Sequence, residues 1–222
     1  MRHLKDYLTP KRHIIWDWNG TLLDDTHYAV HTIGLVLKEQ ALDPIDLDAY
    51  RQKFRFPVRE YYIDLGFDFN RVAFEIVAER FIEHYNREVK TRCELFSGAR
   101  DLLTELKSDQ KGLHVLSAAH EKELLHLLDH HDIRHLFDQV CGLSDNFAAS
   151  KIDRGRDLIA SLNTPNRDII MVGDTDHDIE VAHALGIDIL LLGDGHQDVD
   201  RLHHAAKEKR GVGIHILNSR FE

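Results

Sequence analysis

The segment Asp17-Trp18-Asn19-Gly20-Thr21 follows a short apolar run, His13–Trp16, and carries the side chains best placed for chemistry. Ligands bind at the carboxyl ends of strands in open parallel sheets, so an acid in this place faces a cleft and not the core. The second polar position is an amide, Asn19, although acid–base chemistry there would need an acid. The function of the chain therefore depends on Asp17 and Asn19.

Three further segments place polar side chains at similar points later in the chain. Val115-Leu116-Ser117 ends in a hydroxyl, Lys151 opens a helical pattern after a loop, and Gly173 to Asp178 contains three carboxylates. Each is ordinary when taken singly, because serines cap helices, lysines are solvated at surfaces and aspartates complement helix N-termini. All four segments in this order are much harder to obtain by chance, so we predict that they form one site.

Short apolar runs recur as candidate strands and alternate with helical patterns. The candidate strands are Ile14–Asp17, Leu113–Ser117, Gln139–Gly142, Ile169–Gly173, Ile187–Leu192 and Gly213–Leu217. The helical patterns among them are Ala99–Lys107, Lys122–Asp129, Ile152–Leu162, Asp178–Leu185 and Val199–Lys207. Strands that alternate with helices predict an α/β fold, with a Rossmann-like parallel sheet and helices on both faces.

Residues 26–92 interrupt this alternation, because they contain helical patterns and no convincing strand. The patterns are Tyr28–Gln40, Leu47–Lys53, Val58–Leu65 and Arg71–Lys90. The last has apolar residues at three- and four-residue spacing, which indicates one buried stripe on a helix. We therefore predict an α/β core domain of residues 1–25 and 93–222, and a helical cap domain of residues 26–92 over the active edge of the sheet.

Composition and charge exclude several classes of protein. The 222 residues carry a formal net charge of −10, which argues against a nucleic-acid binder, because phosphate backbones need clustered Lys and Arg. No apolar run approaches the roughly 18 residues of a membrane span, so we expect no membrane partner. The two cysteines, Cys93 and Cys141, lie far apart and suggest neither a zinc ribbon nor a disulfide framework. A cytoplasmic location is the simple interpretation.

The four segments resemble the motifs of the haloacid dehalogenase superfamily, whose first motif is of the Asp-x-Asp-Gly-Thr type. That superfamily also has a Ser or Thr after the second strand, a Lys, and a Gly-Asp-x-x-x-Asp motif. The matching residues are Asp17 to Thr21, Ser117, Lys151, and Gly173-Asp174 to Asp178. The resemblance covers nearly the whole chain, and the helical cap between the first two motifs is similar to the phosphoglycolate phosphatase-like branch. It implies a hydrolase of phosphoric monoesters.

The resemblance also implies a role for each matched residue. Asp17 would attack phosphorus and form an aspartyl-phosphate, which splits one difficult displacement into two easier ones. The expected cofactor is Mg²⁺, which prefers hard oxygen ligands, and its ligands would be Asp17, Asp174, Asp178 and the backbone carbonyl of Asn19. The expected phosphate-binding residues are Thr21, Ser117, Ala118 and Lys151. The expected catalytic residues are Asp17, Asn19 and Lys151.

Asn19 is a departure from this pattern, because the phosphatase branch has an Asp that protonates the leaving oxygen and then deprotonates water. Loss of a positioned acid–base group costs roughly 10²–10⁴-fold in rate. Three interpretations follow. In the first, the chain is a phosphatase of reduced or altered activity, which recruits Asp176, His177 or a cap residue. In the second, it is a phosphonatase-like C–P hydrolase with Lys38 or Lys53 as a Schiff-base lysine. In the third, it is a weak pseudoenzyme that binds a phosphorylated ligand or partner. The phosphatase ranks first, because the other motif residues are intact.

The cap offers one candidate substrate contact, Arg55, in the segment before a helix. Its guanidinium could bind a second anionic group of a substrate in bidentate fashion. His120 follows Ser117 near the predicted cleft, where it could bind substrate or cap a helix. We expect a small phosphorylated substrate, because a closing cap suits small metabolites, and a monomer or homodimer as the assembly.

Overall fold

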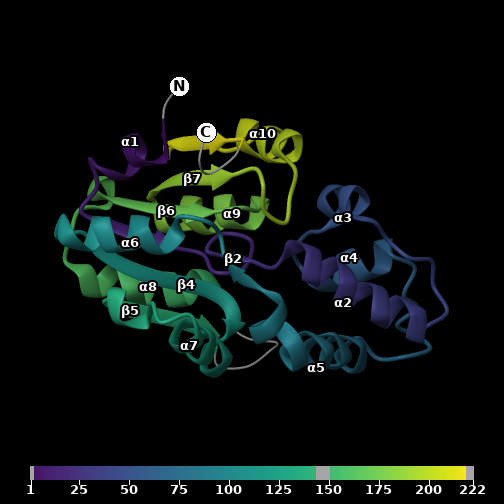
Figure 1. The fold of residues 1–222 in the computed structure, drawn as a ribbon. Helices are drawn as coiled ribbons and strands as arrows, with labels where there is room; N and C mark the ends of the chain where they lie inside the picture. The colour runs from purple at the N-terminus through teal and green to yellow at the C-terminus, as the bar shows by residue number, and fades with distance from the viewer. Residues whose placement is uncertain (1–2, 144–150, 219–222) are drawn as a thin grey trace.

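The computed structural model describes residues 3–143 and 151–218, and its centre is a six-stranded parallel sheet (Figure 1). The strand order is β5-β4-β1-β6-β7-β8. Their bounds are β1 (His13–Trp16), β4 (Gly112–His120), β5 (Gln139–Leu143), β6 (Ile169–Gly173), β7 (Asp188–Leu192) and β8 (Ile214–Leu217). Because β1 lies between β4 and β6, the strand order reverses at β1, and a ligand crevice is expected at its carboxyl end.

Helices cover both faces of the sheet, which explains why its strands are apolar at nearly every position. Successive side chains of β1 point to opposite faces, so Ile14 and Trp16 pack in one cluster and Ile15 packs in the other. The first cluster includes residues of α1 (Leu4–Leu8), α6 (Ala99–Ser108) and α7 (Glu121–His130). The second includes residues of α8 (Lys151–Leu162), α9 (Asp176–Leu185) and α10 (Val199–Lys207). Short 3-10 helices span Arg134–Leu136 and Asn166–Asp168.

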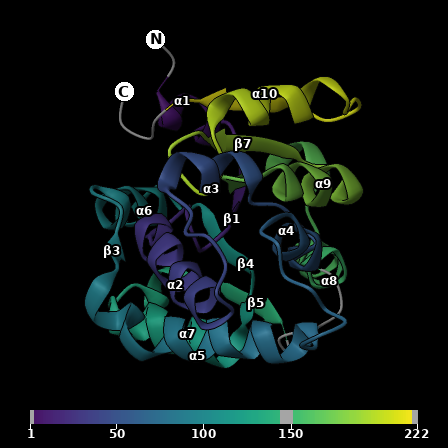
Figure 2. The ribbon, with the colours of Figure 1, turned by 90° about the vertical axis from the view of Figure 1, so that its right-hand side faces the viewer.

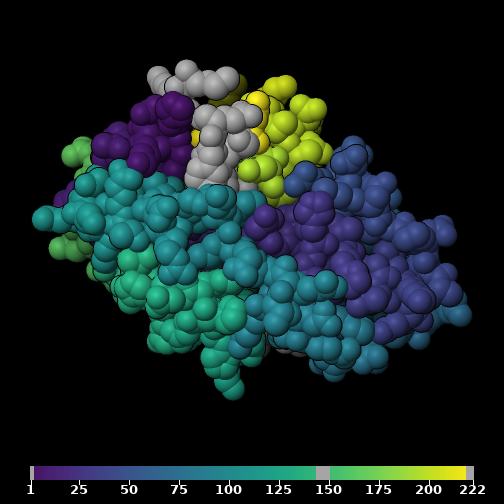
Figure 3. Space-filling model, viewed as in Figure 1, coloured from purple at the N-terminus to yellow at the C-terminus, as the bar shows by residue number. Residues whose placement is uncertain are grey.

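Residues 26–92, all of which the structure describes, form helices and no strand. The helices are α2 (Thr26–Glu39), α3 (Leu47–Lys53), α4 (Val58–Asp64) and α5 (Phe74–Arg92). They share a hydrophobic cluster of their own and form a lobe beside the sheet (Figure 3). Seen from their side, these helices lie in front of the sheet (Figure 2). The antiparallel strands β2 (Leu23–Asp24) and β3 (Glu94–Leu95) flank the lobe. The division into domains at residues 25 and 93 stays a prediction.

The predicted α/β fold with a parallel sheet is confirmed, and each of the six candidate strands overlaps a strand, although Asp17, Ile187 and Gly213 lie just outside the observed bounds. The largest difference in the sheet is β4, which continues past Ser117 to His120. α5 begins at Phe74 and not at Arg71, and Ile76 on the predicted buried stripe is 54% exposed. The short elements α1, β2 and β3 were not predicted, because two to five residues are too few to show a period. In the part of the chain that the structure describes, no helix is long and apolar enough to cross a bilayer.

Candidate active site

Asp17 lies directly after β1, where the sheet holds its backbone at the switch point. Its amide nitrogen donates to the carbonyl of Val172 in β6 at 2.8 Å, and the residue is 8% exposed. The chain then turns at Gly20, whose φ is +65°. A Cβ at Gly20 would lie 2.2 Å from an oxygen of Asp174, so both the turn and the close approach require glycine here.

The second acidic segment follows β6 and opens α9. Asp178 accepts from the backbone amides of Asp174 and Thr175 and from the Thr175 hydroxyl, all through Oδ2, at 2.8–3.2 Å. This reciprocal capping arrangement satisfies amides that the helix start leaves unpaired. A Cβ at Gly173 would lie 2.5 Å from the Asp178 carboxyl carbon, so glycine lets the carboxylate lie against the strand. Asp178 is therefore fixed before any ligand binds.

Lys151, the first residue of α8, joins the two acidic segments. Its Nζ lies 2.6 Å from Oδ1 of Asp17 and 2.7 Å from Oδ1 of Asp178. Asp174 completes the group, since Asp17, Asp174 and Asp178 each offer a carboxylate oxygen within 4.8 Å of the others. All four side chains are buried, so these charges act in a medium of low dielectric constant.

Three carboxylates against one ammonium leave two negative charges, which one divalent cation would balance. Burial raises the pKa of Asp17 to about 7, although the Lys151 ammonium opposes this shift. Burial likewise raises the pKa of Asp174 to about 6. Burial also disfavours the ionised form of Asp178, but Lys151, together with His177 and Thr175, holds the pKa of that carboxyl below its ordinary value. Hard oxygen donors with this excess of negative charge fit Mg²⁺.

The phosphate-binding candidates surround this group. Ser117 in β4 is buried, and its Oγ accepts from the Ala119 amide at 3.0 Å, a bond that does not use the hydroxyl proton. Thr21 donates its hydroxyl to Oδ1 of Asp174 at 2.8 Å, so it orients a carboxylate. Ser117, Ala118 and Lys151 line a cavity of about 300 Å³ between the sheet edge and residues 26–92. A carboxylate nucleophile, a hydroxyl and an ammonium thus face one cavity.

Comparisons with known proteins agree with this geometry. The family model of haloacid dehalogenase-like hydrolases matches residues 14–192. The chain belongs to the haloacid dehalogenase-like hydrolase family. The expected resemblance and the expected enzyme class, a hydrolase of this type, are therefore confirmed.

The sequence relatives of the chain include a protein kinase and a phosphatase. The tyrosine-protein kinase PtkA of Mycobacterium tuberculosis is 27% identical over 192 residues, which span 84% of this chain and 64% of that protein. The phosphoglycolate phosphatase of Caulobacter vibrioides is 24% identical over 192 residues, which span 83% of this chain and 80% of that protein. The similarity to the phosphoglycolate phosphatase-like branch thus extends over most of both chains.

Solved structures show the same fold. A haloacid dehalogenase-like family protein from Streptococcus pneumoniae superposes with a TM-score of 0.77 at 21% identity, covering 93% of this chain and 95% of that one. The structure of PtkA gives a TM-score of 0.76 at 24% identity and covers 94% of each chain. The helices of residues 26–92 are thus part of an arrangement that this haloacid dehalogenase-like hydrolase shares with other proteins.

Three other candidate residues do not line the cavity. Arg55 is not among the residues that line the cavity, and its guanidinium pairs with Asp64 of α4 at 2.8 Å. Lys38 and Lys53, the candidate Schiff-base lysines, are exposed and also lie outside the cavity lining. The ion pair with Asp64 explains why the Arg55 guanidinium lies at α4.

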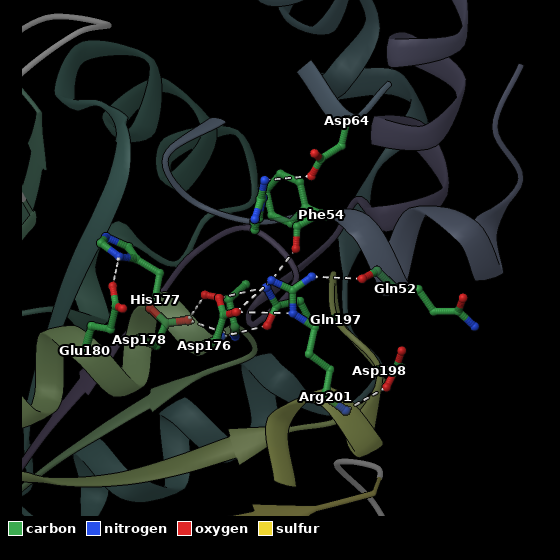
Figure 4. Close-up of polar contacts among 12 residues, drawn as sticks. Gln52, Phe54, Asp64, Asp176, His177, Asp178, Glu180, Gln197, Asp198 and Arg201 are labelled. Carbon is green, nitrogen blue, oxygen red and sulfur yellow. Dashed lines mark hydrogen bonds and ion pairs between the residues drawn. The ribbon is translucent and has the colours of Figure 1, made fainter. Parts of the chain in front are cut away.

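Asp176 and His177, the alternative acid–base candidates, each have partners, although His177 also lines the cavity. Figure 4 shows Asp176 between Gln197 and Arg201, and His177 with Glu180. His120 begins α7, and its ring accepts from the Lys122 amide at 3.3 Å. Of the two roles predicted for His120, the structure shows the helix-capping one, although the residue also lines the cavity.

Sequence analysis missed a buried network beside Asn19 in this haloacid dehalogenase-like hydrolase. Oδ2 of Asp25 accepts from Nδ2 of Asn19 at 2.8 Å and from the Tyr85 hydroxyl at 2.6 Å. Oδ1 of Asp25 accepts from the Gly20 amide at 2.7 Å and pairs with Nε2 of His196 at 3.2 Å. His196 follows β7, so its place after a strand end was the one available signal.

The opposite charges of Asp25 and His196 stabilise this network. Burial disfavours the charged form of His196, but the carboxylates of Asp25, Asp174 and Asp17 together raise the pKa of His196 to about 9. The same ion pair holds the pKa of Asp25 below its ordinary value against the effect of burial. The hydroxyl of Tyr50 lies 2.9 Å from Nδ1 of His196, so both ring nitrogens have partners.

Proposed function

We propose that the protein is a Mg²⁺-dependent phosphatase that hydrolyses a small phosphate monoester through an aspartyl-phosphate on Asp17. One observation carries this proposal: Asp17, Asp174 and Asp178 lie within 4.8 Å of one another, with the Lys151 ammonium between two of them, at the switch point of the sheet. The phosphoglycolate phosphatase relatives support phosphate ester hydrolysis as the reaction.

Each residue has a task in the first step. An oxygen of Asp17 forms a bond to phosphorus while the bond to the leaving oxygen breaks, and the electron pair stays on that oxygen. Lys151 balances the negative charge and, with the Ser117 hydroxyl, binds the non-bridging oxygens. The carboxylates of Asp17, Asp174 and Asp178, with the backbone carbonyl of Asn19, would hold Mg²⁺. When bound, Mg²⁺ would neutralise charge on the phosphoryl oxygens.

In the second step water hydrolyses the phosphoaspartate and regenerates Asp17. In the phosphatase branch an Asp at this position removes a proton from the water. The amide of Asn19 cannot accept that proton near neutral pH. Both amide hydrogens of Asn19 are committed, one to Asp25 and one to Tyr85. We therefore infer an enzyme of reduced activity, most reduced for substrates whose leaving oxygen needs a proton.

The phosphonatase-like alternative receives no support, because Lys38 and Lys53 are exposed and do not line the cavity. A panel of small phosphate esters tests the proposal directly. Phosphate release would be measured near neutral pH, with excess Mg²⁺ in one assay and with EDTA in the other. We expect release only with Mg²⁺. Binding of esters without any release would show a pseudoenzyme and overturn the proposal.

A further inference from the structure

The cavity above Asp17 is walled mainly by aromatic and aliphatic side chains of residues 26–92. Its aromatic lining includes Phe54, Phe56, Tyr61, Tyr62, Phe74 and Phe81, and aliphatic residues such as Ile33 and Val58 add to it. Small-molecule sites of this kind bury the apolar body of a ligand and orient it by a few polar groups. Here the phosphate-binding candidates lie beside Asp17, so the apolar part of the cavity is available to the part of the substrate that leaves.

The lining offers little to a second negative charge. Among the described residues, Lys151 is the only lysine or arginine that lines the cavity, and Asp17 and Asp178 already pair with it. Three histidines also line the cavity, but His196 pairs with Asp25, His177 pairs with Glu180, and the His120 ring accepts from the Lys122 amide. Glu123 adds a further carboxylate to the lining. A carboxylate on the leaving group would lose its hydration without gaining an opposite charge, which is costly.

Contacts from the core fix the aromatic wall in place. Nε2 of Gln197 donates to the carbonyl of Phe54 at 2.9 Å, and a guanidinium nitrogen of Arg201 donates to the carbonyl of Gln52 at 2.9 Å (Figure 4). The Phe56 ring stacks on His177 with ring centroids 4.6 Å apart. The segment that carries Phe54 and Phe56 is therefore held against the core by direct contacts.

The state of Asn19 independently points to the same kind of substrate. Its amide group donates to Asp25 and Tyr85, and therefore no donor at position 19 is left to protonate a leaving oxygen. A phenol has a pKa near 10, as in tyrosine, whereas water has a pKa near 15.7 and alcohols are similarly weak acids. An aryl oxide thus leaves without a proton far more readily than an alkoxide does.

From these two observations we propose that the leaving group is an uncharged aromatic ring, so that the substrate is an aryl phosphate. This proposal rests on the phosphatase activity proposed above. In the first step the Asp17–phosphorus bond forms, the phosphorus–oxygen bond to the ring breaks, and the aryl oxide takes the electron pair and a proton from solvent. In the second step water adds to phosphorus, Asp17 leaves as a carboxylate, and both water protons stay on the released phosphate.

A matched pair of ligands separates the fit of the cavity from the intrinsic reactivity of the ester. Phenyl phosphate and 4-carboxyphenyl phosphate share the aryl ester and differ in one charge. We expect the KM of the carboxylated ester to be at least about tenfold higher, because its charge enters an aromatic cavity. Phenylphosphonate and 4-carboxyphenylphosphonate, which bind without ester hydrolysis, should show the same preference by calorimetry in the presence of Mg²⁺.

Variants at two positions of one helix, α5, test the wall. Phe81→Ala and Phe81→Leu remove a lining ring, whereas Ile76→Ala changes an exposed residue of α5. We expect Phe81→Ala to raise the KM for phenyl phosphate by about tenfold, Phe81→Leu to raise it less, and Ile76→Ala to leave it unchanged. Phe81→Arg should favour the carboxylated ester. Circular dichroism would verify that each variant is folded.

The outcomes distinguish this proposal from the one on which it rests. If no ester is hydrolysed but phenylphosphonate binds in preference to its carboxylated form, the phosphatase proposal fails and the aromatic preference stands. If 2-phosphoglycolate or the carboxylated ester is hydrolysed with an equal or lower KM than phenyl phosphate, the protein is a phosphatase and the aromatic proposal is wrong. Equal effects of Phe81→Ala and Ile76→Ala would also overturn it.

Discussion

The side-chain amide of Asn19 donates to a carboxylate oxygen of Asp25 at 2.8 Å. A carboxylate only accepts hydrogen bonds, so the nitrogen of the Asn19 amide, and not its oxygen, must face Asp25. The Tyr85 hydroxyl lies 2.8 Å from the same nitrogen and donates to Asp25 in turn. The amide at position 19 is thus part of a hydrogen-bonded network. An aspartate in its place would have to be protonated to donate to Asp25.

An exchange of these two side chains provides the sharpest test of position 19. Asn19→Asp alone would place two carboxylates in contact, so one must hold a proton, and we expect about 1–3 kcal/mol lower stability at pH 8. The double variant Asn19→Asp with Asp25→Asn keeps one acid and one amide, and it should recover part of that loss, because Asp25→Asn also removes the carboxylate that pairs with the buried His196. Urea unfolding would measure both.

The same variants should hydrolyse alkyl phosphates faster than the natural protein, by about tenfold or more, because an acid at position 19 can protonate an alkoxide. The measurement is phosphate release from a simple alkyl ester with Mg²⁺. Rates equal to or below those of the natural protein would mean that another group supplies the proton.

Hydrolysis of the phosphoaspartate should limit turnover of aryl phosphates, since no base at position 19 activates the water. We therefore expect stopped-flow traces to show a burst of phenol close to one equivalent per enzyme, followed by a slower steady rate. In the double exchange variant the burst should shrink. A linear trace from the first turnover would show that the second step is not slow.

Asp17→Asn should lower turnover by at least about 10³-fold, because the nucleophile is lost. The same change should raise the thermal midpoint in metal-free buffer, because burial raises the pKa of Asp17 and the ionised carboxylate is unfavourable in the folded state above pH 7. Asp24→Asn, which removes an exposed neighbouring charge, is the control and should do neither. Surviving activity in Asp17→Asn would refute the covalent route.

Mg²⁺ should stabilise the fold, because it binds three carboxylates that the unfolded chain does not assemble. At a concentration about 100 times its dissociation constant, the expected gain is about 2.7 kcal/mol. Asp174→Asn should abolish most of this gain, whereas Asp200→Asn, at an exposed position of α10, should retain it. An unchanged thermal midpoint of the natural protein across a Mg²⁺ titration would argue against the metal site.

Stability should also depend on pH through His114, which lies in β4 with its Nε2 3.1 Å from Nδ1 of His13. Burial lowers the pKa of His114 to about 4, while the unfolded side chain has an ordinary value near 6.5. The unfolded state therefore binds more protons between these values, and stability falls as pH falls from 6.5 to 4, by about 3 kcal/mol. His114→Gln should flatten this slope, and His204→Gln, at an exposed position, should not.

The order of strands and helices could be predicted from the sequence because it depends on local patterns. The continuous apolar runs Ile14–Trp16 and Ile169–Val172 are typical of strands buried on both faces, and both became central strands. The same reasoning brought Asp17 and Asp174 together, since carboxyl ends of neighbouring parallel strands meet at one edge of a sheet.

The parts of the site that depend on distant contacts could not be predicted in this way. Asp25 pairs with His196, which lies 171 residues away, and no local pattern links them. Arg55 was expected at the substrate because its type suits anions, but its partner Asp64 could be found only from the packing of α4. The aromatic residues of the cap looked like ordinary core positions, because helical spacing does not distinguish a packed face from a cavity wall.

One residue, His196, joins three parts of the molecule. Its ring contacts Tyr50 of α3 and Asp25, and its backbone amide donates to Oδ2 of Asp174 at 2.7 Å. An outward swing of α3 must break the Tyr50 contact or drag the histidine and loosen a carboxylate of the acidic trio. The position of α3 and the hydrogen bonding of Asp174 are therefore coupled through one histidine.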